Sequence, residues 1–242
     1  MHSKIINYHL ARFLVVLVLS SPTWTQALAQ GAAEKPLYHW VFSGTPANEV
    51  LSVGRNQTAL KAVEAKGAAL ATSAGGSGVD SVWQFIQPPS GQAGGLSAEI
   101  DAELRKFQIT VSCNLNARHS FSKTEYLAGF QKRTFIRFTE ANRLEAGIFI
   151  PGEGWKNIGV GLVEIAPWER WMEINLVYAD GLLVLNVDGT KVDSLDVGNT
   201  SLQGGRVFIV GAMPWGVGDG AFTGQIRRIT IDDHAVSKPS GK

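Results

Sequence analysis

Three acidic side chains at alternating positions, Glu99, Asp101 and Glu103, have the types and spacing to carry out chemistry. Alternate residues of a β-strand point to the same face, so a strand here would present all three carboxyl groups together. Two carboxyl groups about 5 Å apart can hydrolyse a glycosidic bond with retention. In a strand the Cα atoms of Glu99 and Glu103 lie about 13 Å apart, so catalysis would require the side chains to lean together.

A solvated strand edge is the alternative interpretation of this segment. Ile100 and Leu104 are apolar in one phase of the alternation, whereas Phe107 and Ile109 are apolar in the other. This change of phase predicts a turn or bulge near residues 105–106. Because short acidic motifs also arise by chance, we favour the strand edge over catalysis.

Tryptophans in polar, glycine-rich segments are the candidate binding residues. An indole ring can stack on the apolar face of a sugar while nearby polar groups bind its hydroxyls. Trp155 and Trp215 lie in such segments and are predicted to be exposed on loops, where binding residues concentrate. Asn157 and Asp219, together with Glu153, are the polar residues expected beside them. The alternative is that both indoles fold back onto an edge of the core.

The other tryptophans and the cysteine are assigned mostly to the core. Trp40, Trp83 and Trp171 occur in apolar strand patterns and are predicted to be buried. Trp168 is a third candidate for binding. Cys113 is the only cysteine, which excludes an internal disulfide, and we predict a small buried side chain rather than a reactive thiol.

Metal binding is left open by the sequence. Calcium is a candidate cofactor, because Asp219 and the pair Asp232-Asp233 lie in oxygen-rich segments. Calcium takes about six to eight oxygens, however, and no compact ligand motif is present. Solvated acids are therefore favoured. The histidines show neither the spacing of a zinc site nor a neighbouring nucleophile motif.

Alternation of apolar and polar residues predicts an all-β domain. The clearest strand is 107–115, and two Asp-Gly pairs, at 180–181 and 188–189, predict tight turns in a three-stranded meander. The strands of this meander are expected at 171–178, 182–187 and 191–195, and further strands at 37–42, 134–138, 144–150, 158–162, 206–212 and 222–231. Residues 59–66 are expected to support one or two helical turns.

The first 29 residues are typical of an export signal. Lys4 and Arg12 accompany the apolar run 13–19, and small residues end at Ala29. We expect cleavage after Ala29, a secreted (periplasmic or extracellular) protein, and one domain over residues 30–242. The apolar run is shorter than the roughly 20 residues of a membrane helix, so we expect no membrane span in the mature chain. Lys plus Arg number 22 against 21 for Asp plus Glu, without charge runs, which argues against nucleic acid as a partner.

Three segments in order resemble the bacterial laminin G-like branch of the concanavalin A-like lectin and glucanase superfamily. They are the early strand 38–42, the tryptophan-led pair of strands 171–178 and 181–189, and the closing hairpin 207–211 with 222–229. The resemblance covers nearly all of the mature chain and implies a jelly-roll sandwich of two antiparallel sheets, in agreement with the strand pattern. It does not fix the function, because the fold serves lectins, adhesion domains and glycosidases alike.

The segment 99–103 also resembles the catalytic strand of laminarinase-type glycoside hydrolases on this fold. That resemblance implies a nucleophile at Glu99, a helper at Asp101 and an acid/base at Glu103. The flanking residues 94–98 and 104–106 depart from the family pattern, which puts those roles in doubt.

The leading functional hypothesis is a secreted, non-catalytic carbohydrate-binding module of lectin type. It would bind a polysaccharide or glycan through Trp155, Trp215, Asn157 and Asp219. The alternatives are a laminarinase-like hydrolase and a domain that binds a protein of the cell envelope.

Overall fold

The computed structural model describes residues 35–42, 49–62, 70–72, 82–85, 95–100, 104–115, 120–199, 205–213 and 220–233. All of them lie in the second of two units, Lys35–Lys242, and the expected signal sequence lies in the first, Met1–Glu34. No helix among these residues has the length and hydropathy of a membrane span.

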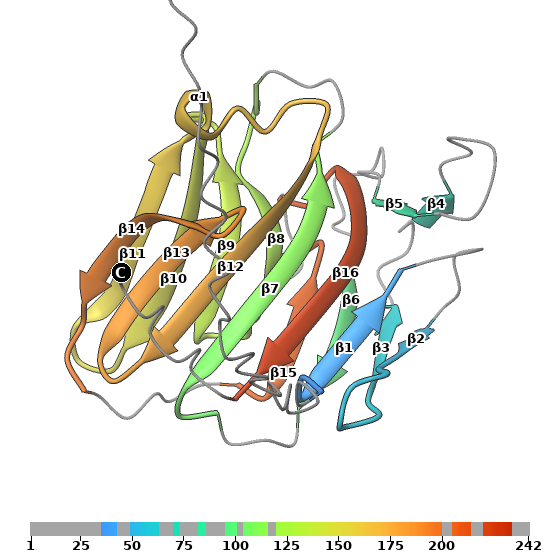
Figure 1. The fold of residues 1–242 in the computed structure, drawn as a ribbon, viewed down its shortest axis with the longest axis horizontal. Helices are drawn as coiled ribbons and strands as arrows, with labels where there is room; N and C mark the ends of the chain where they lie inside the picture. The colour runs from blue at the N-terminus through green and yellow to red at the C-terminus, as the bar shows by residue number, and fades with distance from the viewer. Residues whose placement is uncertain are drawn as a thin grey trace, which may run out of the picture. The chain divides into compact units, whose positions relative to one another are not determined.

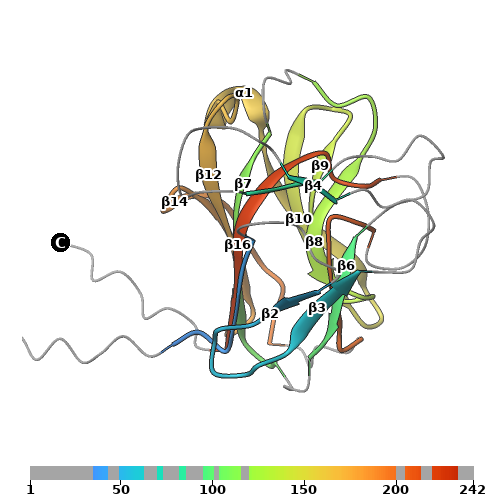
Figure 2. The ribbon, with the colours of Figure 1, turned by 90° about the vertical axis from the view of Figure 1, so that its right-hand side faces the viewer.

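The described strands form two antiparallel sheets that pack face to face, as the strand pattern predicts (Figures 1 and 2). The first sheet has the order β14 (Thr190–Asp196), β13 (Leu182–Val187), β12 (Trp171–Ala179), β7 (Phe107–Asn114), β16 (Gly224–Asp232), β5 (Trp83–Phe85) and β4 (Leu70–Thr72), and β1 (Tyr38–Val41) also pairs with β16. The second has the order β11 (Gly154–Gly161), β10 (Arg143–Ile150), β9 (Thr134–Thr139), β8 (Glu125–Phe130), β15 (Val207–Val210), β6 (Leu96–Glu99), β3 (Ala59–Ala62) and β2 (Glu49–Leu51). A short helix, α1 (Leu162–Ile165), directly follows β11 in the segment that connects β11 to β12.

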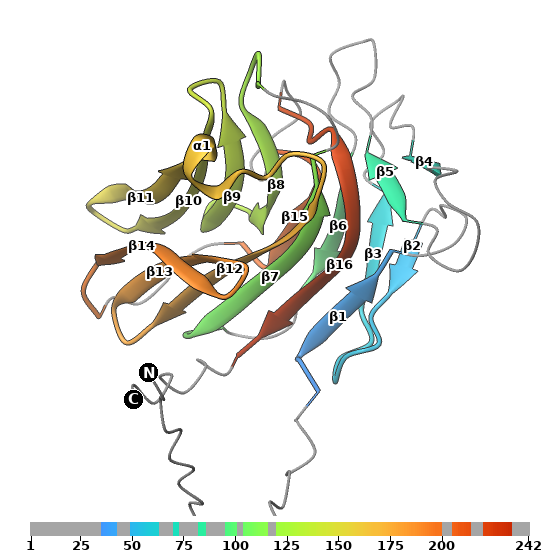
Figure 3. The same ribbon diagram turned by 45° about the horizontal axis from the view of Figure 1, so that its top comes forward.

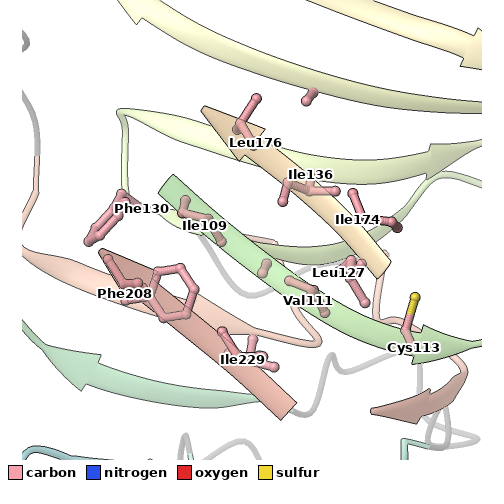
Figure 4. Close-up of a cluster of buried hydrophobic side chains, with 14 of the residues drawn as sticks. Ile109, Val111, Cys113, Leu127, Phe130, Ile136, Ile174, Leu176, Phe208 and Ile229 are labelled. Atoms are coloured by element: carbon pink, nitrogen blue, oxygen red, sulfur yellow. The ribbon is translucent and has the colours of Figure 1, made fainter. Parts of the chain in front are cut away.

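The core lies between the two sheets and follows the alternation of β7. Ile109, Val111 and Cys113 are fully buried and face apolar residues of the opposite sheet, among them Phe208 and Phe130 (Figure 4). The rings of Phe130 and Phe208 lie 5.1 Å apart between centroids. Burial raises the pKa of the Cys113 thiol far above its usual range, and the charge of Asp188 adds to the shift. The prediction of a small, buried cysteine side chain is therefore confirmed.

Trp40 is confirmed as a core residue. Its indole is fully buried and stacks between Tyr38 and Phe208, with centroid distances of 5.4 and 5.9 Å. The indole Nε1 donates a hydrogen bond of 2.8 Å to the carbonyl of Thr58, which satisfies its only polar atom. The side chain of Trp83 lies outside the described residues.

The two Asp-Gly turns form as predicted. Asp180 and Gly181 have φ values of 50° and 82°, and Asp188 and Gly189 have values of 51° and 77°. Positive φ at both central residues is the conformation of the type I′ turn, whose twist matches that of the flanking strands. The strands on either side begin and end within one residue of the predicted positions.

Four expectations about single segments have mixed outcomes. The chain bends at Arg105 and Lys106 before β7, as the change of phase predicts. The helical turns expected at 59–66 are wrong for Ala59–Ala62, which pairs as β3 between β2 and β6, and this pairing overrides the helix propensity of alanine. Residues 63–66 lie outside the described residues. The strand expected at 158–162 begins earlier, at Gly154, and Leu162 starts α1 instead. Trp171 is not in the core, because its phase of β12 faces outward and leaves the side chain half-buried.

The two sheets meet at one edge of the sandwich, where β11 and β14 lie side by side (Figure 3). The backbone N–H of Gly159 in β11 donates a hydrogen bond of 2.8 Å to the Asp193 carboxylate of β14. A side chain thus satisfies a backbone group at the edge of the second sheet.

Gly181 and Gly189, the glycines of the two Asp-Gly turns, provide a matched test of how closely the backbone of Gly198 approaches Gly181. An ideal Cβ on Gly181 would lie 2.7 Å from the carbonyl carbon of Gly198, whereas one on Gly189 would meet nothing within 4 Å. We expect Gly189→Ala to cost about 1 kcal/mol through positive φ alone, and Gly181→Ala to cost clearly more. Urea unfolding of both variants measures the difference, and equal losses would contradict it.

Candidate functional site

Trp155 and Asn157 lie on the outer face of the second sheet, in its edge strand β11. The opposite phase of the strand, with Ile158 and Val160, packs into the core. Trp155 is 36% exposed. The prediction that Trp155 sits on a loop is wrong, because the hairpin turns at residues 151–153 and Gly154 already pairs with Ile150. The sequence therefore identified the exposed residue but not the element that carries it.

Of the other predicted site residues, the structure describes Glu153 and Trp168. Trp215 and Asp219 lie outside the described residues. Glu153 is in the turn before β11 and pairs with Lys156 at 3.0 Å. Trp168 is half-buried and packs against the core, as a tryptophan folded onto an edge would.

Aromatic rings support the Trp155 indole from the neighbouring strands. Phe149, its cross-strand partner in β10, lies 5.6 Å away between centroids, and Phe135 of β9 lies 5.0 Å away. Phe135 in turn meets Tyr126 of β8 edge to face at 6.1 Å. Phe135 and Tyr126 are only 2% and 5% exposed although they lie outside the main core cluster. The indole thus stands on a second, outer layer of packed rings, which holds it in place.

Gly147 allows this layer to lie close to the sheet. It stands opposite Asn157 in β11 and Phe135 in β9. An ideal Cβ at this position would come within 2.5 Å of Phe135 Cζ and 2.6 Å of Asn157 Oδ1. The ring and the amide therefore occupy the space above a bare backbone, and any other residue would displace one of them.

Arg137 is the centre of the polar part of the site. Its Nε and Nη2 donate to Glu145 Oε2 at 3.1 and 2.8 Å, and its Nη1 donates to the Tyr126 hydroxyl at 3.2 Å. The guanidinium also lies 4.4 Å from the Phe135 ring centroid, within the range of a cation–π contact. Burial by itself lowers the pKa of Arg137, but the bonds to Glu145 and Tyr126 raise it by more, so the guanidinium stays charged.

We call these residues the β11 patch: Tyr126, Phe135, Arg137, Glu145, Trp155 and Asn157. They gather because the register aligns Tyr126, Arg137 and Glu145 in one row across β8, β9 and β10. The next positions of β9 and β11 on the same face are Phe135 and Asn157, aligned through Gly147. A partly exposed indole beside amide, carboxylate and guanidinium groups can stack on a sugar ring and exchange hydrogen bonds with its hydroxyls.

The carboxylates considered for catalysis are described only in part. Glu99 is exposed at the end of β6, where it pairs with Val207 of β15, and Asp101 and Glu103 lie outside the described residues. The strand-edge interpretation agrees with the position of Glu99.

The Asp232-Asp233 pair considered for calcium is bound to an arginine. Arg55 Nη2 lies 3.3 Å from Asp232 and 2.5 Å from Asp233. Among the residues that the structure describes, no group of three or more His, Cys, Asp or Glu side chains could hold a metal ion. The second calcium candidate, Asp219, is outside them.

Comparison with known proteins gives structural neighbours only. No family model matches the sequence, and no curated protein matches it. The fold is similar to the binding domain of botulinum neurotoxin DC solved in complex with SialylT, with a TM-score of 0.59 and 10% identity over 84% of this chain and 49% of that one. It is also similar to the DC binding domain solved with rat synaptotagmin II, with a TM-score of 0.56 and 11% identity over 81% and 48%.

A third similar structure is the serotype D binding domain, with a TM-score of 0.60 and 9% identity over 84% of this chain and 49% of that one. The chain thus spans about half the length of these neighbours. At such low identity the likeness concerns the fold alone, a jelly-roll sandwich of two antiparallel sheets.

The ion pair at the centre of the β11 patch is expected to stabilise the outer layer. Arg137 and Glu145 are only 23% and 21% exposed, so solvent screens them less than a surface pair. We expect Arg137→Met and Glu145→Gln each to lower the free energy of unfolding by about 1 to 2 kcal/mol. A double-mutant cycle should give a coupling of about 1 kcal/mol, and the exposed pair Glu153–Lys156 should give close to none.

Acid should weaken the Arg55–Asp233 contact. Partial burial by itself raises the pKa of Asp233, but hydrogen bonds from Arg55 and with Asp232 outweigh it, so this pKa lies below its ordinary value. The contribution to stability is therefore present above the unfolded-state pKa of about 3.9 and is lost as pH falls through the lower folded value. Asp233→Asn should lose stability at pH 7 and flatten the pH dependence below about pH 4 in thermal unfolding. An unchanged acid limb would contradict the assignment.

Proposed function

We propose that this chain is a secreted, non-catalytic carbohydrate-binding module of lectin type, and that it binds a polysaccharide or glycan at the β11 patch. The observation that carries the proposal is the Trp155 indole, which is partly exposed, supported from below by Phe135 and flanked by Asn157. A rigid ring with polar neighbours suits a ligand that has an apolar face and a rim of hydroxyls.

The polar groups of the patch match the two kinds of hydrogen bond that a hydroxyl makes. Glu145 offers acceptor oxygens, and Asn157 offers both a donor and an acceptor. Glu145 is paired with Arg137 at 2.8 Å and lies 3.9 Å from Arg143, so its carboxylate is held between two guanidinium groups at the centre of the patch. The similar binding domain of botulinum neurotoxin DC was solved in complex with SialylT, which supports a glycan as the ligand, and this chain matches 49% of that domain.

The family and the destination of the chain belong to the same proposal. Residues 1–29 would act as an export signal, and residues 30–242 would form a laminin G-like domain of the concanavalin A-like superfamily in the periplasm or outside the cell. The strand order and the two antiparallel sheets are compatible with that superfamily.

A protein of the cell envelope is the second candidate for the ligand. The observation that favours it is that a neurotoxin DC binding domain of similar fold was solved in complex with rat synaptotagmin II, a protein. For the hydrolase alternative with Glu99, Asp101 and Glu103, turnover of a β-glucan that is lost in Glu99→Gln would be the deciding result.

Removal of the Trp155 indole should weaken glycan binding. We expect Trp155→Ala to weaken binding at least about tenfold, equivalent to about 1.4 kcal/mol, because the stacking surface is lost. The measurement is a glycan array of the mature protein, with calcium and with a chelator, followed by titration of the best ligand. Asn157→Ala should weaken the same ligand through a lost hydrogen bond.

Leu182→Ala is the matched control, because this exposed apolar side chain lies on β13 of the first sheet. It should bind as the unaltered protein does, and circular dichroism should show all variants folded. Equal binding by the Trp155→Ala variant would remove the patch from the proposal. If the unaltered protein binds no glycan on the array, either with calcium or with a chelator, the carbohydrate proposal itself is contradicted. A protein of the cell envelope would then be the next candidate for the ligand.

A further inference from the structure

A second polar surface lies on the outer face of the first sheet, at the end where β7 stops and β12 and β16 begin (Figure 1). Trp171, Asn114 and Gln225 stand side by side there in one row of the sheet. Trp171 is half-buried, and its phase of β12 faces away from the core. Arg227 is exposed beside this row.

A β-bulge directs Arg227 onto the tryptophan. The pairing of β16 with β7 shifts register between Ile226 and Arg228, so Arg227 is the extra residue of the bulged strand. Its guanidinium carbon lies 4.8 Å from the Trp171 ring centroid, and its Nε donates a hydrogen bond of 2.7 Å to the hydroxyl of Ser112, which is fully buried. Bulges commonly re-aim a side chain in this way. Both contacts hold the guanidinium against the ring.

The charges around Arg227 leave one cation in excess. Arg228 is paired with the Glu173 carboxylate, and Arg170 Nη1 lies 2.5 Å from Asp188. Among the described residues at this end of the face, three arginines therefore meet two carboxylates. Within the part of the chain that the structure describes, Arg227 contacts no carboxylate, and its two terminal nitrogens bond to nothing.

We propose that Arg227 and Trp171 form an anion site that binds the carboxylate of an acidic sugar, independently of the β11 patch. With Nε bound to Ser112, the edge formed by Nη1 and Nη2 remains available for a planar carboxylate, which it can bind with two parallel hydrogen bonds. The exposed part of the indole suits the rest of a sugar ring, and Asn114 and Gln225 lie in the same row of the sheet as Trp171.

The single excess charge favours a sugar carboxylate over a polyanion. Nucleic acids and membranes that contain anionic lipid are polyanions, and each binds to a cluster of several cationic side chains on a protein. Every cation of such a cluster contributes to the attraction. Here the neighbouring arginines are held by Glu173 and Asp188, and the net charge of the whole chain is only +1. One fixed guanidinium over one ring is suited to one carboxylate at a time.

Titration with a galacturonic acid trimer tests the site, with the change in tryptophan fluorescence or in amide NMR shifts as the readout. The unaltered protein should bind the trimer, and the affinity should fall several-fold as salt is raised from about 50 to 300 mM. Arg227→Gln should weaken binding at least tenfold. The fully methyl-esterified trimer, which has the same rings without charge, should bind at least tenfold more weakly.

Two control variants separate this site from a general effect of surface charge and from the β11 patch. Lys191→Gln removes an exposed cation from β14 of the same sheet and should bind the trimer as the unaltered protein does. In the Trp155→Ala variant the acid should still bind at least tenfold more tightly than its methyl ester, so failure of the β11 patch and failure of this site are distinguishable. The proposal is overturned if Arg227→Gln binds normally, if the methyl ester binds as well as the acid, or if phosphatidylserine vesicles bind where the trimer does not.

Discussion

Both outer surfaces depend on the phase in which each strand enters the core. In β7 every second side chain from Phe107 to Cys113 is buried against the opposite sheet, and β12 and β16 are paired to it on either side. Because the side-chain period of a strand is two residues, a shift of one position would turn the outer face into the core. Burial of the inner face thus decides which residues meet solvent, and the hydrogen-bond register decides which of them become neighbours.

The two surfaces use this constraint in different ways. In the β11 patch the register is regular along β9, β10 and β11, and a missing side chain at Gly147 makes room for Phe135 and Asn157. On the first sheet an extra residue at Arg227 interrupts the pairing and lays the guanidinium on Trp171. One surface is shaped by the absence of a Cβ and the other by a local break in register.

Much of the fold could be predicted from the sequence, because strands with one wet face alternate visibly and Asp-Gly turns have a specific backbone conformation. The strand β8 was missed because all six of its residues, Glu125–Phe130, are buried, which leaves no alternation to detect. Trp171 was misplaced because β12 carries apolar residues in both phases. For the site, residue type alone indicated Trp155 and Asn157. Phe135, Arg137 and Glu145 join them through register, which no local pattern contains.

The contact between Gly159 and Asp193 has a consequence for the behaviour of many copies of this chain together. An open sheet edge can recruit the edge of another molecule and extend into a fibre. Here an incoming strand would have to displace a carboxylate from the backbone of β11 and bring its own peptide groups past a negative charge. The strand that presents Trp155 is therefore protected from polymerisation by the partner sheet, and crowded molecules can stay separate while its outward face remains open.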